Sequence, residues 1–294
     1  MFKKVWFLCL IFFTIISVTA NAQLNIPEYD QLYRVRLWRK VDLREKQNKG
    51  FYAIEREVTK FILDGINSGE LKLYSDQNLT LEEEDVSGLM TRKGAAETNP
   101  FDNAVSYENG EMVSYEGKYY RFISPNSTYG VLPTDIFYWG EVDVEETKGQ
   151  LWSARDIAEL EIIEDAIFDK VRSRLFYDIE AIRLKIPGDV RYSYDPNAGE
   201  NALALPLGYV DYDEVEALFR SREDAKWVNR YNPKEWKNFA DAFLLRLFTG
   251  PIVKYENPDD EYISNMFRSH FEAVMEMSRY EMYLMEREHN LWEY

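Results

Sequence analysis

The sequence predicts an α+β protein, in which antiparallel strands and hairpins pack with several amphipathic helices and a long C-terminal helix. Three segments alternate apolar and polar side chains, as strands with one buried face do: residues 33–43, 158–168 and 175–186. Other segments repeat apolar residues at helical spacing: residues 54–69, 213–219, 233–249 and 264–290. Apolar residues make up 46% of the 294-residue chain, which is enough for a substantial core and too much for a disordered chain.

Residues 1–22 have the pattern of a secretory signal peptide that is cleaved before Gln23. Two lysines near the start precede an apolar run, residues 5–18, and the small residues of 20–22 mark a cleavage site. The run is shorter than the roughly 20 residues that a lasting membrane anchor needs. Cys9, the single cysteine, lies inside this run, so we expect the exported chain to contain none. An exported domain without disulfides suits a bacterial periplasm.

The first predicted strand, residues 33–43, has one apolar face and one basic face. Its apolar phase consists of Tyr33, Val35, Leu37, Val41 and Leu43. The other phase carries Arg34, Arg36, Trp38, Lys40 and, just beyond the strand, Arg44. Because successive side chains of a strand point to opposite faces, the basic residues are expected to gather on one surface.

Two helices are predicted after this strand. Apolar residues from Ile54 to Ile62 fall on one helical face, and Gly69 suits a left-handed cap, so we expect a helix of about four turns. A capping-box pattern at Thr80 predicts a short acidic helix over residues 80–90.

The tyrosine-rich middle of the chain favours strands and turns. Asn109-Gly110 lies between two alternating runs, residues 105–108 and 111–115, and this dipeptide is the strongest short signal for a hairpin. We therefore expect a small meander over residues 104–123.

A long hairpin follows, with a tight basic turn at residues 170–174. Its second strand changes apolar phase after Ile179, which predicts a β-bulge near Glu180 and Ala181. Asp213 begins a short helix, and Asn232-Pro233 begins another that ends at Gly250-Pro251. These elements divide the exported chain into an N-terminal lobe, a C-terminal lobe and a methionine-rich helix, with bounds 23–150, 151–263 and 264–294.

The residues that common catalytic sites need do not occur in a familiar arrangement. A Gly-x-Ser-x-Gly nucleophile turn is absent from the sequence, and His270 and His289 lie too far apart on one helix to share a zinc ion. A net charge of −17 repels nucleic acid. We therefore assign no catalytic, cofactor-binding or metal-binding residues. We expect no cofactor, no nucleic-acid partner and no direct membrane span.

Two other functions remain open at this point. A pair of carboxylates could hydrolyse glycan, although with 52 acidic residues some pairs will be close by chance. The aromatic-rich segment could bind glycan, or its rings could pack across neighbouring strands. These rings are Tyr107, Tyr115, Tyr119, Tyr120, Tyr129, Tyr138 and Trp139.

Three features favour protein partners. The first is the basic strand, with Arg34, Arg36, Trp38, Lys40 and Arg44. The second is the basic turn, with Lys170, Arg172 and Arg174. The third is Met275, Met282 and Met285 of the last helix, because methionine suits adaptable binding surfaces. Each feature also has a local explanation: pairing with nearby acids, a solvated hairpin tip, and packing on the same chain.

Three segments of the sequence resemble the gliding-motility family GldN, also called PorN. They are YRVRLWRKVDLREKQN at 33–48, IFDKVRSRLFYDI at 167–179 and NFADAFLLRLF at 238–248, and they occur in the family's order. The resemblance extends over residues 33–262, is faint between 94 and 150, and does not include the methionine-rich tail.

This resemblance implies a non-enzymatic subunit of the type IX protein secretion system of Bacteroidota. The protein would be periplasmic and associated with the inner face of the outer membrane. It would form a large ring-shaped oligomer with an outer-membrane lipoprotein, GldK or PorK, and contact the periplasmic domain of the motor protein, GldM or PorM. Such a complex supports secretion of surface proteins and gliding motility.

Overall fold

The computed structural model describes residues 26–83, 86, 90, 100–107, 111–124, 128–142, 151–194, 202–229, 231–232 and 234–292. The predicted signal peptide lies outside these residues, as do residues 84, 85 and 87–89 of the predicted acidic helix at 80–90. The predicted start of that helix is wrong, because residues 80–83 are not helical and Glu82 forms a β-bridge with Tyr74. The described chain confirms the α+β class, because antiparallel sheets pack with helices and the last helix is long.

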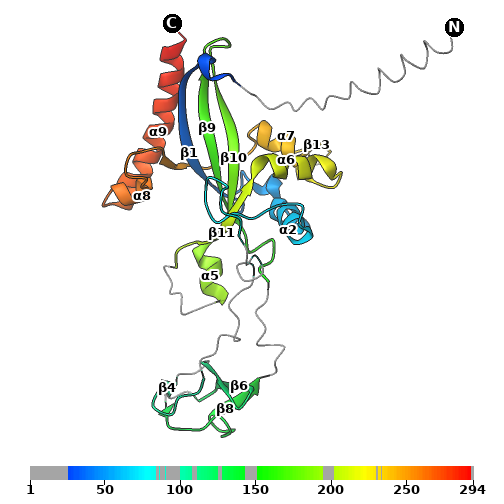
Figure 1. Cartoon of the computed structure of the whole chain (residues 1–294), viewed down its shortest axis with the longest axis vertical. Coiled ribbons are helices and arrows are strands. Elements are labelled where there is room, and N and C mark those ends of the chain that lie inside the picture. Colours follow the sequence, from blue (N-terminus) through cyan, green and yellow to red (C-terminus); the bar gives the residue numbers. More distant parts are fainter. Residues whose placement is uncertain are drawn as a thin grey trace, which may run out of the picture.

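A five-stranded antiparallel sheet forms the centre of the fold (Figure 1). Its order is β11–β10–β9–β1–β14, with bounds β1 Gln31–Asp42, β9 Glu159–Asp169, β10 Arg174–Ile186, β11 Leu205–Asp211 and β14 Ile252–Tyr255. The three strands predicted from alternation are all in this sheet. The predicted bulge is confirmed as well, since the β9–β10 register shifts between Ile179 and Ala181. The shift keeps the apolar residues of β10 on one face despite their change of phase.

Three helices pack on the apolar face of the sheet (Figure 1). They are α2 (Val58–Ser68), α6 (Tyr212–Ser221) and α7 (Phe239–Leu244). α2 ends at Gly69, whose φ of 77° confirms the predicted left-handed cap. α2 is shorter than predicted because the preceding chain folds into η2 (Lys49–Phe51), β2 (Tyr52–Ala53) and β3 (Arg56–Glu57). Ile54 lies in the β2–β3 turn, where it is exposed.

The helices of the second half begin at other residues than predicted. Asp211, not Asp213, caps α6, since its carboxylate accepts the Asp213 amide at 2.9 Å. α7 begins at Phe239 because the residues before it form β13 (Trp236–Asn238), which pairs with β12 (Lys226–Val228). Asn238 then caps α7 by accepting the Ala240 amide at 2.8 Å. A further short helix, α5 (Gly188–Tyr194), follows β10.

The C-terminal segment forms two helices where the spacing predicted one. α8 (Ile263–Met266) is separated by three residues from α9 (His270–Leu291), and Phe267 between them is extended. Ile263 is buried and fixes α8 beside β14, so the chain changes direction before α9 starts. The 22 residues of α9 span about 33 Å at 1.5 Å per residue. Figure 1 shows α9 running along the side of the sheet that carries β1.

The tyrosine-rich segment forms small sheets of its own, seen in the lower part of Figure 1. Its strands are β4 (Ser106–Tyr107), β5 (Met112–Tyr115), β6 (Lys118–Phe122), β7 (Thr128–Tyr129) and β8 (Trp139–Val142). The predicted hairpin at Asn109-Gly110, which itself lies outside the described residues, is wrong. β4 pairs with β7, and β5 pairs with β6 through a two-residue turn at Glu116 and Gly117. Both turn residues have positive φ, as in a type I′ turn.

Several rings of this segment form its core. Tyr107, Tyr120 and Trp139 are buried there, and the Tyr107 and Trp139 ring centroids are 5.2 Å apart. Rings buried in this way stabilise the small sheets and are not available as a flat platform for a sugar. The packing explanation therefore applies to these three rings.

The two predicted lobes share one sheet. β1 comes from the range 23–150, whereas β9, β10, β11 and β14 come from 151–263. β1 pairs with β9 on one side and with β14 on the other. The short helix η1 (Glu28–Asp30) precedes β1.

Candidate partner-binding site

The central sheet has a charged face opposite its apolar face. Residues paired across antiparallel strands point to the same side, so Arg36 lies with Asp165, and Lys40 lies with Glu161. We define the charged face by Arg34, Arg36, Trp38 and Lys40 of β1, Glu159, Glu161 and Asp165 of β9, Asp178, Arg183 and Lys185 of β10, and Lys254 of β14. Six basic and four acidic side chains therefore share one side of the sheet.

Asp165 lies at the centre of the charged face and binds two arginines of β1. The Arg34 Nε and Arg36 Nε atoms are 3.0 and 2.8 Å from its two carboxylate oxygens. Burial acts to raise the pKa of Asp165, but hydrogen bonds from Arg36 and Arg34 outweigh burial and hold its pKa below the ordinary 3.8. The ion cluster therefore stabilises the fold at neutral pH, and this contribution is lost as the pH falls below about 3.8.

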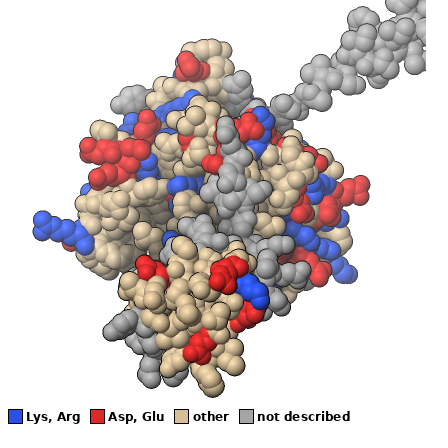
Figure 2. Space-filling view, turned by 60° about the horizontal axis from the view of Figure 1, so that its bottom comes forward, with Lys and Arg blue, Asp and Glu red and all other residues tan. Residues whose placement is uncertain are grey.

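The other basic residues of β1 are also paired within the chain. Lys40 Nζ lies 2.7 Å from Glu159, and Arg44 bonds to Asp42 and Asp189. Trp38 is 4% exposed, because Lys254 lies over its ring at 4.3 Å from the centroid. On the face seen in Figure 2, acidic and basic side chains likewise lie next to one another.

The structure thus brings Arg34, Arg36, Trp38 and Lys40 together and gives each an intramolecular contact. Arg34 and Lys40 remain 45% exposed, so they can still meet another protein. Partner binding by these residues stays a prediction. Reversing their charges would leave buried carboxylates unpaired and would test folding more than docking.

The basic turn between β9 and β10 is also held by local contacts. Arg172 lies 2.6 Å from Asp169, Lys170 Nζ donates to the carbonyl of Tyr29, and Arg174 lies over the Phe176 ring. Val171 at the tip is exposed. The turn therefore presents one apolar side chain between partly neutralised cations, and its partner role stays a prediction.

One side of α9 packs on the sheet. Ala273 and Leu284 are buried there, and the Tyr280 ring stacks on Tyr255 with centroids 4.3 Å apart. Polar contacts fix the helix further: Glu281 binds Arg39 at 2.8 Å, and Arg287 lies over the Tyr33 ring at 4.0 Å. These contacts determine which side of α9 is left for solvent.

The opposite side of α9 carries an exposed apolar stripe. The three predicted methionines all lie on it, with Met275, Met282 and Met285 56%, 53% and 61% exposed. We define the outer stripe by residues separated alternately by four and three positions: Phe271, Met275, Ser278, Met282, Met285, His289 and Trp292. This spacing is that of a helix seam that packs on a second helix or groove.

Among the described residues, no helix has the length and apolar character to cross a membrane.

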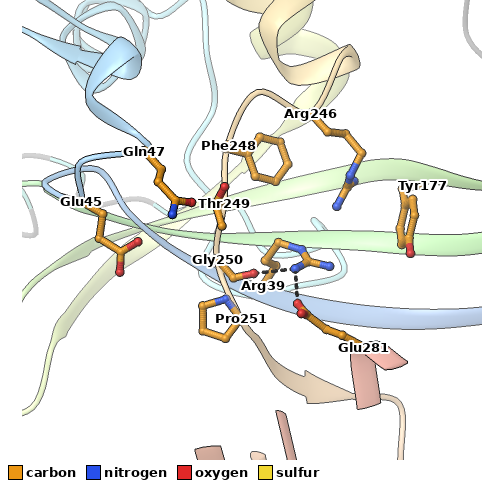
Figure 3. A pocket seen from close by; sticks show the side chains of 10 residues that line it. All are labelled: Arg39, Glu45, Gln47, Tyr177, Arg246, Phe248, Thr249, Gly250, Pro251 and Glu281. Atoms are coloured by element: carbon orange, nitrogen blue, oxygen red, sulfur yellow. Dashed lines mark hydrogen bonds and ion pairs between the residues drawn. The ribbon is translucent and has the colours of Figure 1, made fainter. Parts of the chain in front are cut away.

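A buried ion cluster on the apolar face was not identified from the sequence. Glu164 of β9 is 0% exposed and bonds to Arg39 of β1 at 3.1 Å and to Arg246, after α7, at 2.6 Å. Arg39 also donates to the carbonyl of Gly250 and to Glu281 of α9, as Figure 3 shows. The cluster links β1, β9, α9 and the segment after α7.

A cavity of about 460 Å³ lies beside this cluster and is drawn in Figure 3. Its walls include Arg39, Tyr177, Arg246 and Glu281, and Arg246 lies over the Tyr177 ring at 4.2 Å. The sequence did contain a signal for the cluster, since Glu164 is the charged residue within the otherwise apolar inward phase of β9. The arginines that bind Glu164, Arg39 and Arg246, lie in distant segments of the chain, so no sequence spacing predicts their pairing with it.

Asp178 of β10 lies in an unfavourable environment. It faces the same side as Asp165, its neighbour on β9. Burial, followed by the nearby carboxylates of Glu180 and Asp213, raises the pKa of Asp178 from 3.8 to about 6. The folded protein therefore binds this proton more tightly than the unfolded chain does, so ionisation of Asp178 lowers stability progressively as the pH rises from about 4 to about 6.

Asp178→Asn is expected to stabilise the protein at pH 7.5 by about 1–2 kcal/mol, since one pKa unit corresponds to about 1.4 kcal/mol and solvent around the half-buried carboxylate weakens the effect. The gain should shrink as the pH falls below 6 and should be mostly gone at pH 4. Urea unfolding of both proteins at these two pH values measures the difference. A gain of equal size at both would show that titration of Asp178 is not its cause.

Comparison with known proteins gives a family for the chain. A family model described as gliding motility associated protein GldN matches residues 26–293. The match covers nearly the whole chain and extends beyond residue 262 to include α9. A search of curated proteins gives no match.

Proposed function

The chain belongs to the GldN family of gliding motility associated proteins, and from this premise we propose that it is a non-enzymatic structural subunit of a periplasmic ring complex. The family is associated with gliding motility and type IX secretion. In the proposed role, the protein supports secretion of surface proteins and movement of the cell. Its proposed location is the inner face of the outer membrane.

The outer stripe of α9 is the observation that supports a structural role best. It sets five large apolar side chains in the solvent along one rigid helix: Phe271, Met275, Met282, Met285 and Trp292. Contiguous exposed apolar surface on a folded protein commonly marks a protein interface. The helix is already fixed to the sheet from its other side. Binding of a partner to the stripe therefore does not have to order the helix backbone.

Three partners are proposed for this protein. They are a GldK- or PorK-like outer-membrane lipoprotein, the periplasmic domain of a GldM- or PorM-like motor protein, and further copies of the chain itself. The outer stripe, the basic turn and the exposed arginines of the charged face give three separate surfaces for them.

One observation keeps an enzymatic role as a second candidate. Asp165 and Asp178 are neighbours, and their pKa values are shifted in opposite directions. Such a difference is used by carboxylate pairs that cleave glycans. Glycan hydrolysis by the purified protein, lost in Asp178→Asn, would support this candidate over the structural one.

Isolation of the native complex tests the proposed function. A C-terminal affinity tag in the native host, gentle solubilisation of the envelope, electron microscopy and mass spectrometry give the size and composition of the particle. The expected result is a large ring that contains an outer-membrane lipoprotein. A free monomer, in cells whose secretion survives deletion of the gene, would reject the structural role.

A further inference from the structure

One edge of β10 is open for part of its length. β9 pairs with β10 on one side, whereas on the other side β11 pairs only with residues 181–186. Near the start of β10, the Leu175 amide donates to Glu288 of α9 at 3.1 Å. Within the described part of the chain, no strand covers residues 176–180 from the β11 side. Backbone groups on such an edge can pair with an added strand.

A cavity of about 330 Å³ runs along this open edge. Its lining includes every β10 residue from 174 to 179. Since successive side chains point to opposite faces of a sheet, a cavity that touches all of them must pass around the edge of the strand. The facing wall is formed by α6 and α7, through Tyr212, Glu216 and Phe243.

The charges of the cavity favour a cationic occupant near Asp178. Three arginines line the cavity. Arg220 and Arg246 are already bonded to carboxylates, at 2.7 Å from Glu216 and 2.6 Å from Glu164, and Arg174 lies over the Phe176 ring at 5.5 Å from its centroid. Asp178 makes no hydrogen bond or ion pair among the described residues. Its raised pKa has burial and neighbouring carboxylates as causes, and a cation placed beside it would counter both effects.

The length of the open edge limits what can bind there. Glu288 ends it at Leu175, and β11 ends it at Ala181. The 13-residue β10 strand of a second copy would extend beyond both ends and collide with α9 or β11. A short extended segment of about five residues matches the length of the open edge.

We propose that an extended segment of a partner protein, containing a lysine or arginine, binds along residues 176–180 of β10 and places its cation beside Asp178. Hydrogen bonds between the two backbones hold the segment, and the cavity accepts its side chains. This binding mode goes beyond the proposed ring function and does not depend on it. The expected partner is therefore a protein with an exposed extended segment that contains a lysine or arginine.

Photo-crosslinking in the native host tests this proposal. Phe176 is replaced with p-benzoylphenylalanine, which keeps an aromatic ring at the open edge, and irradiated cells are analysed by mass spectrometry. The expected product joins β10 to a partner segment that contains a lysine or arginine. Asp178→Lys should lower the yield about tenfold or more, because a like charge replaces the counter-ion.

Two controls separate strand addition from loss of folding. Asp259→Lys reverses an exposed acid in the loop after β14 and should leave the yield unchanged. Asp178→Lys places a cation near Glu180 and Asp213, so the free protein should keep its melting temperature. If Asp178→Lys does not fold, hydrogen exchange of the wild-type protein, free and in its complex, tests the proposal instead. The amides of Tyr177 and Ile179 point away from β9, as that of Leu175 does, and should exchange at least about tenfold more slowly in the complex than in the free protein.

Three results would overturn the proposal: no cross-link, a cross-link to another copy of this chain, or exchange at Tyr177 and Ile179 that is equally fast in free and bound protein. Isolation of a ring complex without the cross-link would reject strand addition and leave the proposed ring function intact.

Discussion

Replacing both Arg39 and Arg246 with methionine is expected to lower the free energy of unfolding by about 3–5 kcal/mol. Both guanidinium groups bind the carboxylate of Glu164, which is fully buried on the apolar face. Without them, a negative charge would remain in a core where water cannot solvate it. Urea unfolding of the double variant measures the loss directly.

Adding Glu164→Leu to this double variant should restore most of the lost stability. A buried ion cluster replaced by apolar side chains is often as stable as the original, because its desolvation cost disappears with it. Recovery should stay incomplete, since Arg39 also binds Glu281 and the Gly250 carbonyl. Arg279→Met, at an exposed position of α9, serves as control and should change stability by less than about 0.5 kcal/mol. A double variant that loses less than about 1 kcal/mol would show that water reaches Glu164.

The elements that the sequence predicted well are those whose signal is local. Alternation along β1, β9 and β10 follows from one buried face, and a change of phase requires a bulge, which the structure has between Ile179 and Ala181. Gly69 likewise marks the end of α2 because its backbone conformation is one that glycine adopts easily. These features do not depend on distant residues.

The elements that it predicted poorly depend on pairing between segments. Trp236 has helical spacing with Phe239, yet it joins a strand because β12 is available as a partner. Asn109-Gly110 is a strong turn signal, but the strands that it was expected to join, β4 and β5, pair with β7 and β6 respectively. Tertiary pairing outweighed local propensity in both cases.

In the candidate site, too, local features could be predicted from the sequence, whereas features that depend on distant segments could not. Helical spacing placed the three methionines on one side of α9, but only the packing of Tyr280 and Leu284 on the sheet determines that this side is exposed. The partners of the basic strand could not be assigned from the sequence, because Asp165 lies more than a hundred residues after Arg36. The open edge of β10 depends on the length of β11, which no local pattern fixes.

Changing Met275, Met282 and Met285 together to glutamate is expected to abolish assembly of the native complex while leaving the protein folded. Each buried methionine contributes about 1.5–3 kcal/mol to an interface, and 1.4 kcal/mol corresponds to a tenfold change in affinity. Loss of three should therefore raise the dissociation constant about a thousandfold or more. The fold should be preserved because these side chains face solvent and glutamate favours helix as well as methionine does. Sedimentation of the tagged complex and the melting temperature of the purified variant measure the two effects.

A variant of α2 gives the matched control for this experiment. Lys60→Glu combined with Asn67→Glu changes the net charge by the same three units on another exposed helix surface. If added negative charge alone disrupts assembly, both variants will fail. If the outer stripe is the interface, the α2 variant assembles and the α9 variant sediments as a folded monomer. An α9 variant that still enters the ring would show that the stripe is not required for assembly, and the partner surfaces would then have to be sought at the basic turn and the open edge of β10.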